Sequence, residues 1–158
     1  MRDGRPVLLV EDDTIDAMTV QRAFRDLKVT NSLAHTLNGE EALAYLTEEG
    51  NERPCVILLD LNMPKMNGLE FLRHIKADPE LRKIPAIVLT TSNEERDIVA
   101  SFKLSVAGYI VKPVDYQKFV EAVRTIDLYW TLSESPGKKT EERNARRQAT
   151  IAGRGQHR

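Results

Sequence analysis

Seven polar residues stand directly after short apolar runs, and their types are those that handle phosphate groups and metal ions. They are Glu11, Asp12, Asp13, Asp60, Thr90, Thr91 and Lys112. Carboxylates, hydroxyls and an ammonium group brought to one place could bind a hard cation such as Mg²⁺ together with a phosphoryl group. In that arrangement Asp60 could act as a nucleophile and form an aspartyl phosphate.

These residues are far apart in the sequence, so they can lie close together only if the strands of one sheet position them. Four short runs are apolar on both faces, as strands of a buried parallel sheet require: Pro6–Val10, Cys55–Leu59, Ala86–Leu89 and Gly108–Val111. A more polar fifth strand, Ser32–Leu37, is typical of a sheet edge. Because the carboxyl ends of such strands share one edge, we expect the polar residues to gather there.

Amphipathic segments of helical length separate the strands. The predicted helices are Thr14–Leu27, Glu40–Thr47, Gly68–Ala77, Asn93–Leu104 and Asp115–Leu132. The buried side of the first is expected to carry Ile15, Met18, Phe24 and Leu27, with Thr14 as its cap. The alternation predicts a (βα)5 fold, a doubly wound, five-stranded parallel sheet of the flavodoxin-like α/β class, in a single domain.

The composition divides the 158-residue chain into two parts. Residues 1–133 hold 16 basic and 21 acidic residues, whereas residues 134–158 hold seven and three. We expect a mildly acidic domain over 1–133 and a basic, disordered tail over 134–158. An acidic domain is a poor candidate for binding nucleic acid.

Several classes of protein are excluded by what the sequence lacks. No apolar run is long enough to span a membrane, and no signal peptide pattern is present. The single cysteine, Cys55, excludes an intrachain disulfide framework, so we expect a cytoplasmic protein. The glycine-rich motifs of nucleotide-binding proteins and the serine elbow of hydrolases are also absent.

Four fragments carry a resemblance to a known family. LLVEDD, ILLDLNMPKMNGLEFL, IPAIVLTTS and AGYIVKPVD occur in this order along the chain. Together they resemble the receiver domain of two-component response regulators, over roughly residues 5–132. The resemblance implies a module that accepts a phosphoryl group from a histidine kinase, with no other enzymatic activity.

The resemblance also implies which residues form the metal and phosphoryl site. Asp60 would be the phosphoacceptor, and Glu11 and Asp12 would be the acidic pair that binds Mg²⁺. Asn62 would offer its backbone carbonyl to the metal ion. Taken singly, Asp12 or Asp13 could equally be a helix cap.

Three further residues match positions that hold or sense the phosphoryl group in the family. Lys112 corresponds to the lysine of the Lys-Pro motif, and its bond to Pro113 is expected to be cis. Thr90 corresponds to the hydroxyl residue that moves toward the phosphoryl group. Tyr109 corresponds to the aromatic side chain that changes rotamer with it.

A narrower resemblance concerns the partner. VEDDTIDA and DLYWTLSESP resemble the stand-alone receivers paired with histidine kinases of the bacterial phytochrome type. This implies a light-sensing kinase as partner and a homodimer. Tyr129, Trp130 and Leu132 could form the dimer face, or could pack into the core.

Two other functions compete with phosphotransfer signalling. A phosphatase with Asp60 as nucleophile would need an acid two residues later, where Asn62 stands. A degenerate receiver would act as an unphosphorylated binding module. The intact set of Glu11, Asp12, Asp60, Thr90 and Lys112 argues against it.

Overall fold

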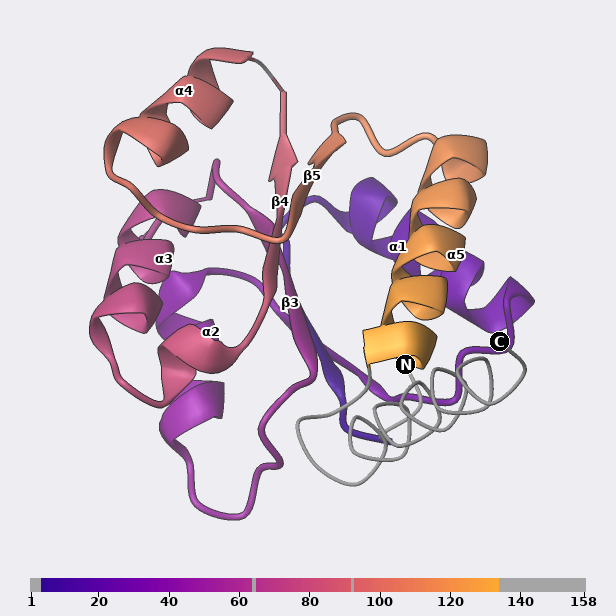
Figure 1. Ribbon diagram of the computed structural model, residues 1–158, viewed down its shortest axis with the longest axis horizontal. Coiled ribbons are helices and arrows are strands. Elements are labelled where there is room, and N and C mark those ends of the chain that lie inside the picture. The colour runs from indigo at the N-terminus through magenta and orange to yellow at the C-terminus, as the bar shows by residue number, and fades with distance from the viewer. Residues whose placement is uncertain (1–3, 64, 92, 134–158) are drawn as a thin grey trace, which may run out of the picture.

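The chain folds around a five-stranded parallel sheet with helices on both faces (Figure 1). The computed structural model describes residues 4–63, 65–91 and 93–133, without the side chains of Ser101 and of residues 126–133. The strands are β1 (Val7–Val10), β2 (Leu33–Thr36), β3 (Val56–Asp60), β4 (Ala86–Thr90) and β5 (Gly108–Val111). The helices are α1 (Thr14–Asp26), α2 (Gly39–Thr47), α3 (Gly68–Ala77), α4 (Asn93–Ser101) and α5 (Tyr116–Ser133), with a 3₁₀ turn η1 (Leu81–Lys83).

The strand order is β2-β1-β3-β4-β5, which confirms the predicted doubly wound fold. All neighbouring pairs are parallel, and the polar strand β2 lies at one edge, as its sequence predicts. The chain reverses its direction of winding between β1 and β3. Ligands of open α/β sheets bind at the carboxyl ends of the strands beside such a switch point.

The sheet has a separate apolar core on each face, because successive strand residues point to opposite sides. On one face, Leu9 of β1 packs with α1 and α5, where the rings of Phe24 and Phe119 stack with centroids 6.1 Å apart. On the other face, Leu8 packs with Phe71 of α3, next to α2 and α4. Figure 1 shows α1 and α5 on one side of the sheet and α2, α3 and α4 on the other. The strands are therefore held rigidly from both sides.

Asp13, and not Thr14, caps α1. The side chain of Asp13 accepts a hydrogen bond from the backbone N–H of Asp16 at 2.9 Å. Asn38 and Asn67 cap α2 and α3 in the same way. Of the two acids that could have served as a helix cap, Asp13 is thus used for this purpose, which leaves Asp12 available to the site.

The predicted buried side of α1 is wrong at two positions. Ile15 is 75% exposed and Met18 is 60% exposed. The inward positions include Asp16, Val20 and Ala23, which lie about one turn apart. Asp16 can lie on this inward face because its carboxylate is bound from inside the molecule, as described below.

The other helix ends agree with the prediction to within a few residues. The largest difference is at α4, which ends at Ser101 instead of Leu104. Lys103 adopts a left-handed backbone conformation with φ 54°, and the N–H of Leu104 bonds to the carbonyl of Val99. A residue in this conformation ends a helix.

Some predictions fall outside the described residues. These are the basic tail, residues 134–158, and the side chains of Tyr129, Trp130 and Leu132, which were assigned to a dimer face. Their roles stay predictions. Among the residues that the structure describes, no helix is long and apolar enough to cross a membrane.

Gly68 allows the start of α3 to press against the end of β3. A Cβ atom at this position would lie 2.1 Å from the carbonyl oxygen of Asp60 and 2.6 Å from the Cα of Leu61. The N–H of Gly68 also donates to the carbonyl of Leu61 at 3.1 Å. Backbone atoms cannot yield as a side chain can, so this close contact fixes the position of Asp60.

We therefore predict that Gly68→Ala lowers the free energy of unfolding by about 2 kcal/mol, through overpacking against the backbone. Urea denaturation measures this change. Gly108→Ala is the matched control, since no atom of the described residues other than its chain neighbours lies within 4 Å of the added Cβ. The stability of this variant should change by at most about 0.5 kcal/mol. Equal stability of the two variants would contradict the prediction.

Candidate functional site

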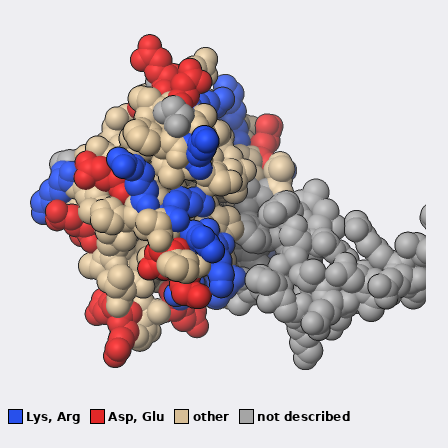
Figure 2. Space-filling view, turned by 60° about the vertical axis from the view of Figure 1, so that its left-hand side comes forward, with Lys and Arg blue, Asp and Glu red and all other residues tan. Residues whose placement is uncertain are grey.

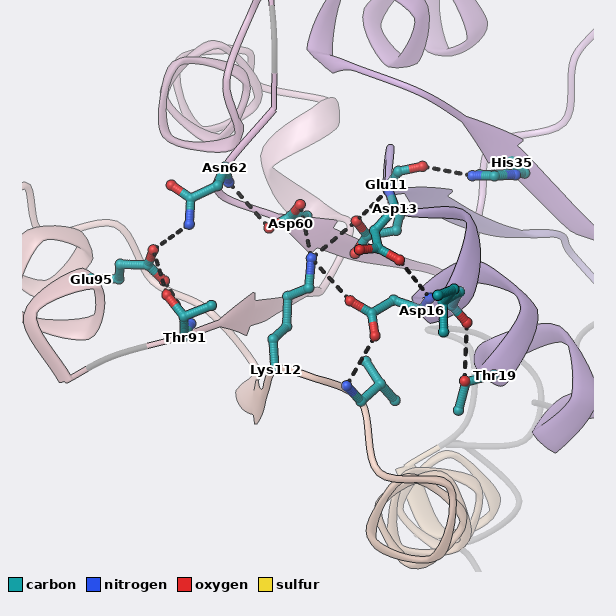
Figure 3. A network of polar contacts seen from close by, with 12 residues as sticks. Glu11, Asp13, Asp16, Thr19, His35, Asp60, Asn62, Thr91, Glu95 and Lys112 are labelled. Atoms are coloured by element: carbon teal, nitrogen blue, oxygen red, sulfur yellow. Dashed lines mark hydrogen bonds and ion pairs between the residues drawn. The ribbon is translucent and has the colours of Figure 1, made fainter.

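The carboxyl ends of four strands bring the predicted polar residues to one edge of the sheet (Figure 3). Glu11 directly follows β1, and Asp60 is the last residue of β3, the neighbouring strand. Thr90 ends β4, and Lys112 follows β5 with its N–H bonded to the carbonyl of Thr90 at 2.8 Å. Glu11, Asp60 and Thr90 are each at most 1% exposed. Their positions are thus set by the strands themselves.

The ammonium group of Lys112 joins three carboxylates. It donates to Oε1 of Glu11 at 3.0 Å and to Oδ2 of Asp60 at 3.1 Å. It also lies 3.2 Å from Oδ2 of Asp16. Burial alone would lower the pKa of Lys112, but its hydrogen bond to Glu11 and the charge of Asp60 outweigh burial and raise the pKa. Lys112 therefore stays charged and partly neutralises the acidic group.

Asp16 is a site residue that the sequence prediction missed. It is 5% exposed, and its Oδ1 accepts a hydrogen bond from the backbone N–H of Val114 at 3.0 Å. Its other oxygen pairs with Lys112. Asp16 thus fixes α1 to the segment between β5 and α5, and orients the lysine from the side away from Asp60.

Three carboxylates could hold a metal ion at this edge. Glu11, Asp12 and Asp60 each offer an oxygen, and these oxygens lie within 4.8 Å of one another. Oε2 of Glu11 is buried and has no hydrogen-bond partner among the described residues, a state that costs free energy unless something binds there. Oxygen donors without cysteine or histidine suit Mg²⁺ or a similar hard cation. The described residues therefore fit such an ion.

The titration of Glu11 reflects its crowded surroundings. Burial raises the pKa of Glu11 to about 7, and the negative charge of Asp60 raises it as well. A hydrogen bond from the backbone of Asp13 and the contact with Lys112 act in the opposite direction. Near neutral pH, full ionisation of this carboxylate thus depends on further positive charge.

Glu95, in the first turn of α4, gathers a second set of polar groups (Figure 3). Its Oε2 accepts from the hydroxyl of Thr90 at 2.5 Å and from the N–H of Thr91 at 2.9 Å. Its Oε1 accepts from the side-chain amide of Asn62 at 2.5 Å and from the hydroxyl of Thr91 at 3.1 Å. The hydroxyl of Thr90 therefore donates its hydrogen bond toward α4 in this structure.

The remaining predicted residues lie around this centre. The backbone N–H of Asn62 donates to Oδ1 of Asp60 at 3.1 Å, which orients that carboxylate. Tyr109 is half-buried on β5, and the guanidinium of Arg96 lies 5.1 Å from its ring centroid. The peptide bond between Lys112 and Pro113 is cis, as expected.

Weak sequence signals existed for the two missed acids. Asp16 is a charged residue in register with Val20 and Ala23 on the inward face of α1. A charged side chain is rarely buried unless a partner binds it, so this position hints at a partner. Glu95 stands three residues after Ser92, a spacing typical of a helix capping box. Neither signal identifies the partner, because each partner is far away in the sequence or on another element.

Residues 7–124 match the family described as the response regulator receiver domain. Response regulator Rcp1 from Synechocystis sp. is 38% identical over 128 residues, which cover 78% of this chain and 87% of Rcp1. A Mn²⁺-bound structure of Rcp1 covers 84% of this chain and 98% of its own, with a TM-score of 0.69 and 36% identity.

Two other solved structures are similar in sequence and fold. The bacteriophytochrome response regulator RtBRR is 38% identical, with a TM-score of 0.70, over 96% of this chain and 95% of its own. The phosphorylated cyanobacterial phytochrome response regulator RcpA is also 38% identical, with a TM-score of 0.71, over 85% of this chain and 99% of its own.

The raised pKa of Glu11 predicts a specific dependence of stability on pH. The unfolded chain releases this proton near pH 4.5, and the folded chain releases it near pH 7. Between these values the folded state binds the proton more tightly, so this contribution to stability is lost as pH rises. Without Mg²⁺, the wild type should therefore lose stability relative to Glu11→Gln from pH 4.5 to 7, as measured by urea unfolding.

Mg²⁺ provides the complementary test. Since the ion binds the ionised carboxylate, its apparent affinity should fall by up to about tenfold per pH unit below pH 7. Glu40→Gln, which changes an exposed acid at the start of α2, should behave like the wild type in both experiments. Parallel pH curves for the wild type and Glu11→Gln would contradict the assignment.

Proposed function

The chain belongs to the response regulator receiver domain family, and on that premise we propose that it accepts a phosphoryl group on Asp60 from a histidine kinase. Receiver domains are signalling modules whose chemistry is confined to their own phosphorylation and dephosphorylation. The observation that carries the proposal is the surroundings of Asp60, a buried carboxylate bonded to Lys112 and close to the oxygens of Glu11 and Asp12.

The transfer step follows from that arrangement. An oxygen of Asp60 attacks the phosphorus atom of a phosphohistidine on the kinase. The new O–P bond forms as the P–N bond breaks, and the bonding electron pair returns to the imidazole. In the later hydrolysis, a water oxygen bonds to phosphorus and the bond to Asp60 breaks, which restores the carboxylate and releases inorganic phosphate.

Positive charge must accompany the transferred group, because the site is already acidic. A divalent cation supplies part of this charge, and the residues that would hold it are Glu11, Asp12, Asp60 and the backbone carbonyl of Asn62. Lys112 supplies the rest when its ammonium donates to a phosphoryl oxygen in place of the Asp60 carboxylate. The N–H of Asn62 already orients Asp60 for attack.

We propose that phosphorylation shifts the balance between two conformations of the face formed by α4, β5 and α5. We call this face the output face, because partner proteins would sense the change there. The phosphoryl group stabilises the state in which the hydroxyl of Thr90 points toward it. Tyr109, on the neighbouring strand, is assigned the accompanying rotamer change. This output would act through protein contacts.

The proposed partner is a histidine kinase of the bacterial phytochrome type. Receiver domains interact with histidine kinases, and this chain is related to phytochrome response regulators. We propose in addition a homodimer through the end of α5, where the sequence places Tyr129, Trp130 and Leu132. Adjacent aromatic residues are typical anchors of protein interfaces.

The phosphoacceptor assignment predicts the result of a simple mass measurement. Incubated with Mg²⁺ and acetyl phosphate, the wild type should gain the mass of one phosphoryl group, because Asp60 is the only carboxylate proposed as nucleophile. Asp60→Asn should gain none. Intact-mass spectrometry reads both results.

Asp13→Asn is the matched control for this experiment. It removes an acid from the same loop, and asparagine is an equally good helix cap for α1. This variant should be phosphorylated like the wild type. Full phosphorylation of Asp60→Asn would contradict the assignment, and an unmodified wild type would favour the degenerate receiver instead.

The dimer is tested by sedimentation velocity over a range of protein concentrations. The wild type should form dimers, and Trp130→Ala should weaken their association about tenfold or more, because aromatic anchors dominate interfaces. Gln117→Ala, at an exposed position near the start of α5, should have no effect. A wild type that remains monomeric at high concentration would contradict the proposal.

A further inference from the structure

We infer that Glu95 is a positioning residue which holds Thr90 and Asn62 in the unphosphorylated state and competes with the phosphoryl group for the hydroxyl proton of Thr90. The inference rests on the proposed function and adds a specific regulator to it. Glu95 sets how readily the site accepts and keeps a phosphoryl group, although it does not touch the reacting atoms.

The competition follows from the number of protons on the Thr90 hydroxyl. A hydroxyl has one proton to donate. In this structure it is donated to Oε2 of Glu95 at 2.5 Å. A phosphoryl oxygen on Asp60 can receive this proton only after the bond to Glu95 breaks. The free energy needed to break that bond therefore weakens the binding free energy of the phosphoryl group by the same amount.

The carboxylate of Glu95 is well suited to this role. Among the described residues, each of its oxygens accepts two hydrogen bonds, from Thr90, Thr91 and Asn62. Hydrogen bonds to an ionised acceptor are about twice as strong as neutral ones. The carboxylate is thus a strong competitor for the Thr90 proton.

Glu95 also connects the site to α4, which belongs to the proposed output face. It lies in the first turn of α4, beside Glu94, and Figure 2 shows acidic side chains gathered at the top of the molecule over this helix. The side chain of Asn62, after β3, is held by the same carboxylate as Thr90, after β4. When Thr90 leaves, the first turn of α4 loses one of its attachments to the sheet.

The experiment compares the affinity of each variant for beryllofluoride, a phosphoryl analogue, in the presence of Mg²⁺. Fluorine NMR of the bound analogue gives the affinity. Glu95→Ala should bind about tenfold more tightly than the wild type, as expected for the loss of one charge-assisted hydrogen bond. Glu95→Gln, which keeps an acceptor oxygen but loses the charge, should fall between the two.

Two controls separate competition for Thr90 from a general effect of charge. Glu94→Ala removes the same charge from an exposed neighbour on α4 and should change the affinity less than twofold. In a Thr90→Ala background, Glu95→Ala should no longer tighten binding, because the proton for which it competes is gone. A purely structural role of Glu95 would not produce this dependence on Thr90.

The outcomes distinguish this inference from the proposed function. An equal gain from Glu95→Ala in the presence and absence of the Thr90 hydroxyl would show charge repulsion and overturn the inference. Unchanged affinity in folded Glu95→Ala and Glu95→Gln would also overturn it, while leaving the receiver assignment intact. A wild type that binds no beryllofluoride and takes no phosphoryl group from acetyl phosphate would remove the proposed function and the inference with it.

Discussion

Carboxylates that are crowded into a buried place must be neutralised, and this constraint explains how the structure is organised. Glu11 and Asp60 come from neighbouring strands, and Asp16 comes from the helix between β1 and β2. Lys112 reaches all three from the far edge strand, β5. The ammonium group therefore ties together elements whose residues are between 52 and 101 positions apart in the sequence. Three carboxylates carry more negative charge than one ammonium group neutralises, so the site favours the binding of a second cation. With that cation bound, a phosphoryl group can also be accommodated.

The remainder of the fold supplies rigidity at this edge. Apolar packing on both faces fixes the central strands, so their carboxyl ends cannot move apart. The contact of Gly68 with the backbone of Asp60 prevents α3 from shifting. By contrast, the side chains of Thr90 and Asn62 both donate to the carboxylate of Glu95, on α4. A rigid acidic centre beside a side-chain attachment that can be released is a suitable arrangement for a two-state response.

The sequence predicted the strands and their terminal polar residues well, because a run that is apolar on both faces has few alternatives to a central parallel strand. Glu11, Asp60, Thr90 and Lys112 therefore lie where the sequence analysis placed them. The helices were less predictable. Ile15 and Met18 fit an apolar stripe, but both are exposed, and α1 instead buries Asp16, which pairs with Lys112 on a distant segment. Glu95 was missed for a similar reason, since its partners lie on other elements. Contacts of this kind depend on tertiary structure, and a local pattern does not reveal them.

The central claim is that Asp60 carries the phosphoryl group as an acyl phosphate. Borohydride reduces an aspartyl phosphate to homoserine, so the modified position can be read in the peptide sequence. The protein would be treated with Mg²⁺ and acetyl phosphate, reduced, digested and sequenced by tandem mass spectrometry. We expect homoserine at position 60, and none when Mg²⁺ is omitted. Homoserine at another acid, or at no position in a protein that remains folded, would contradict the account.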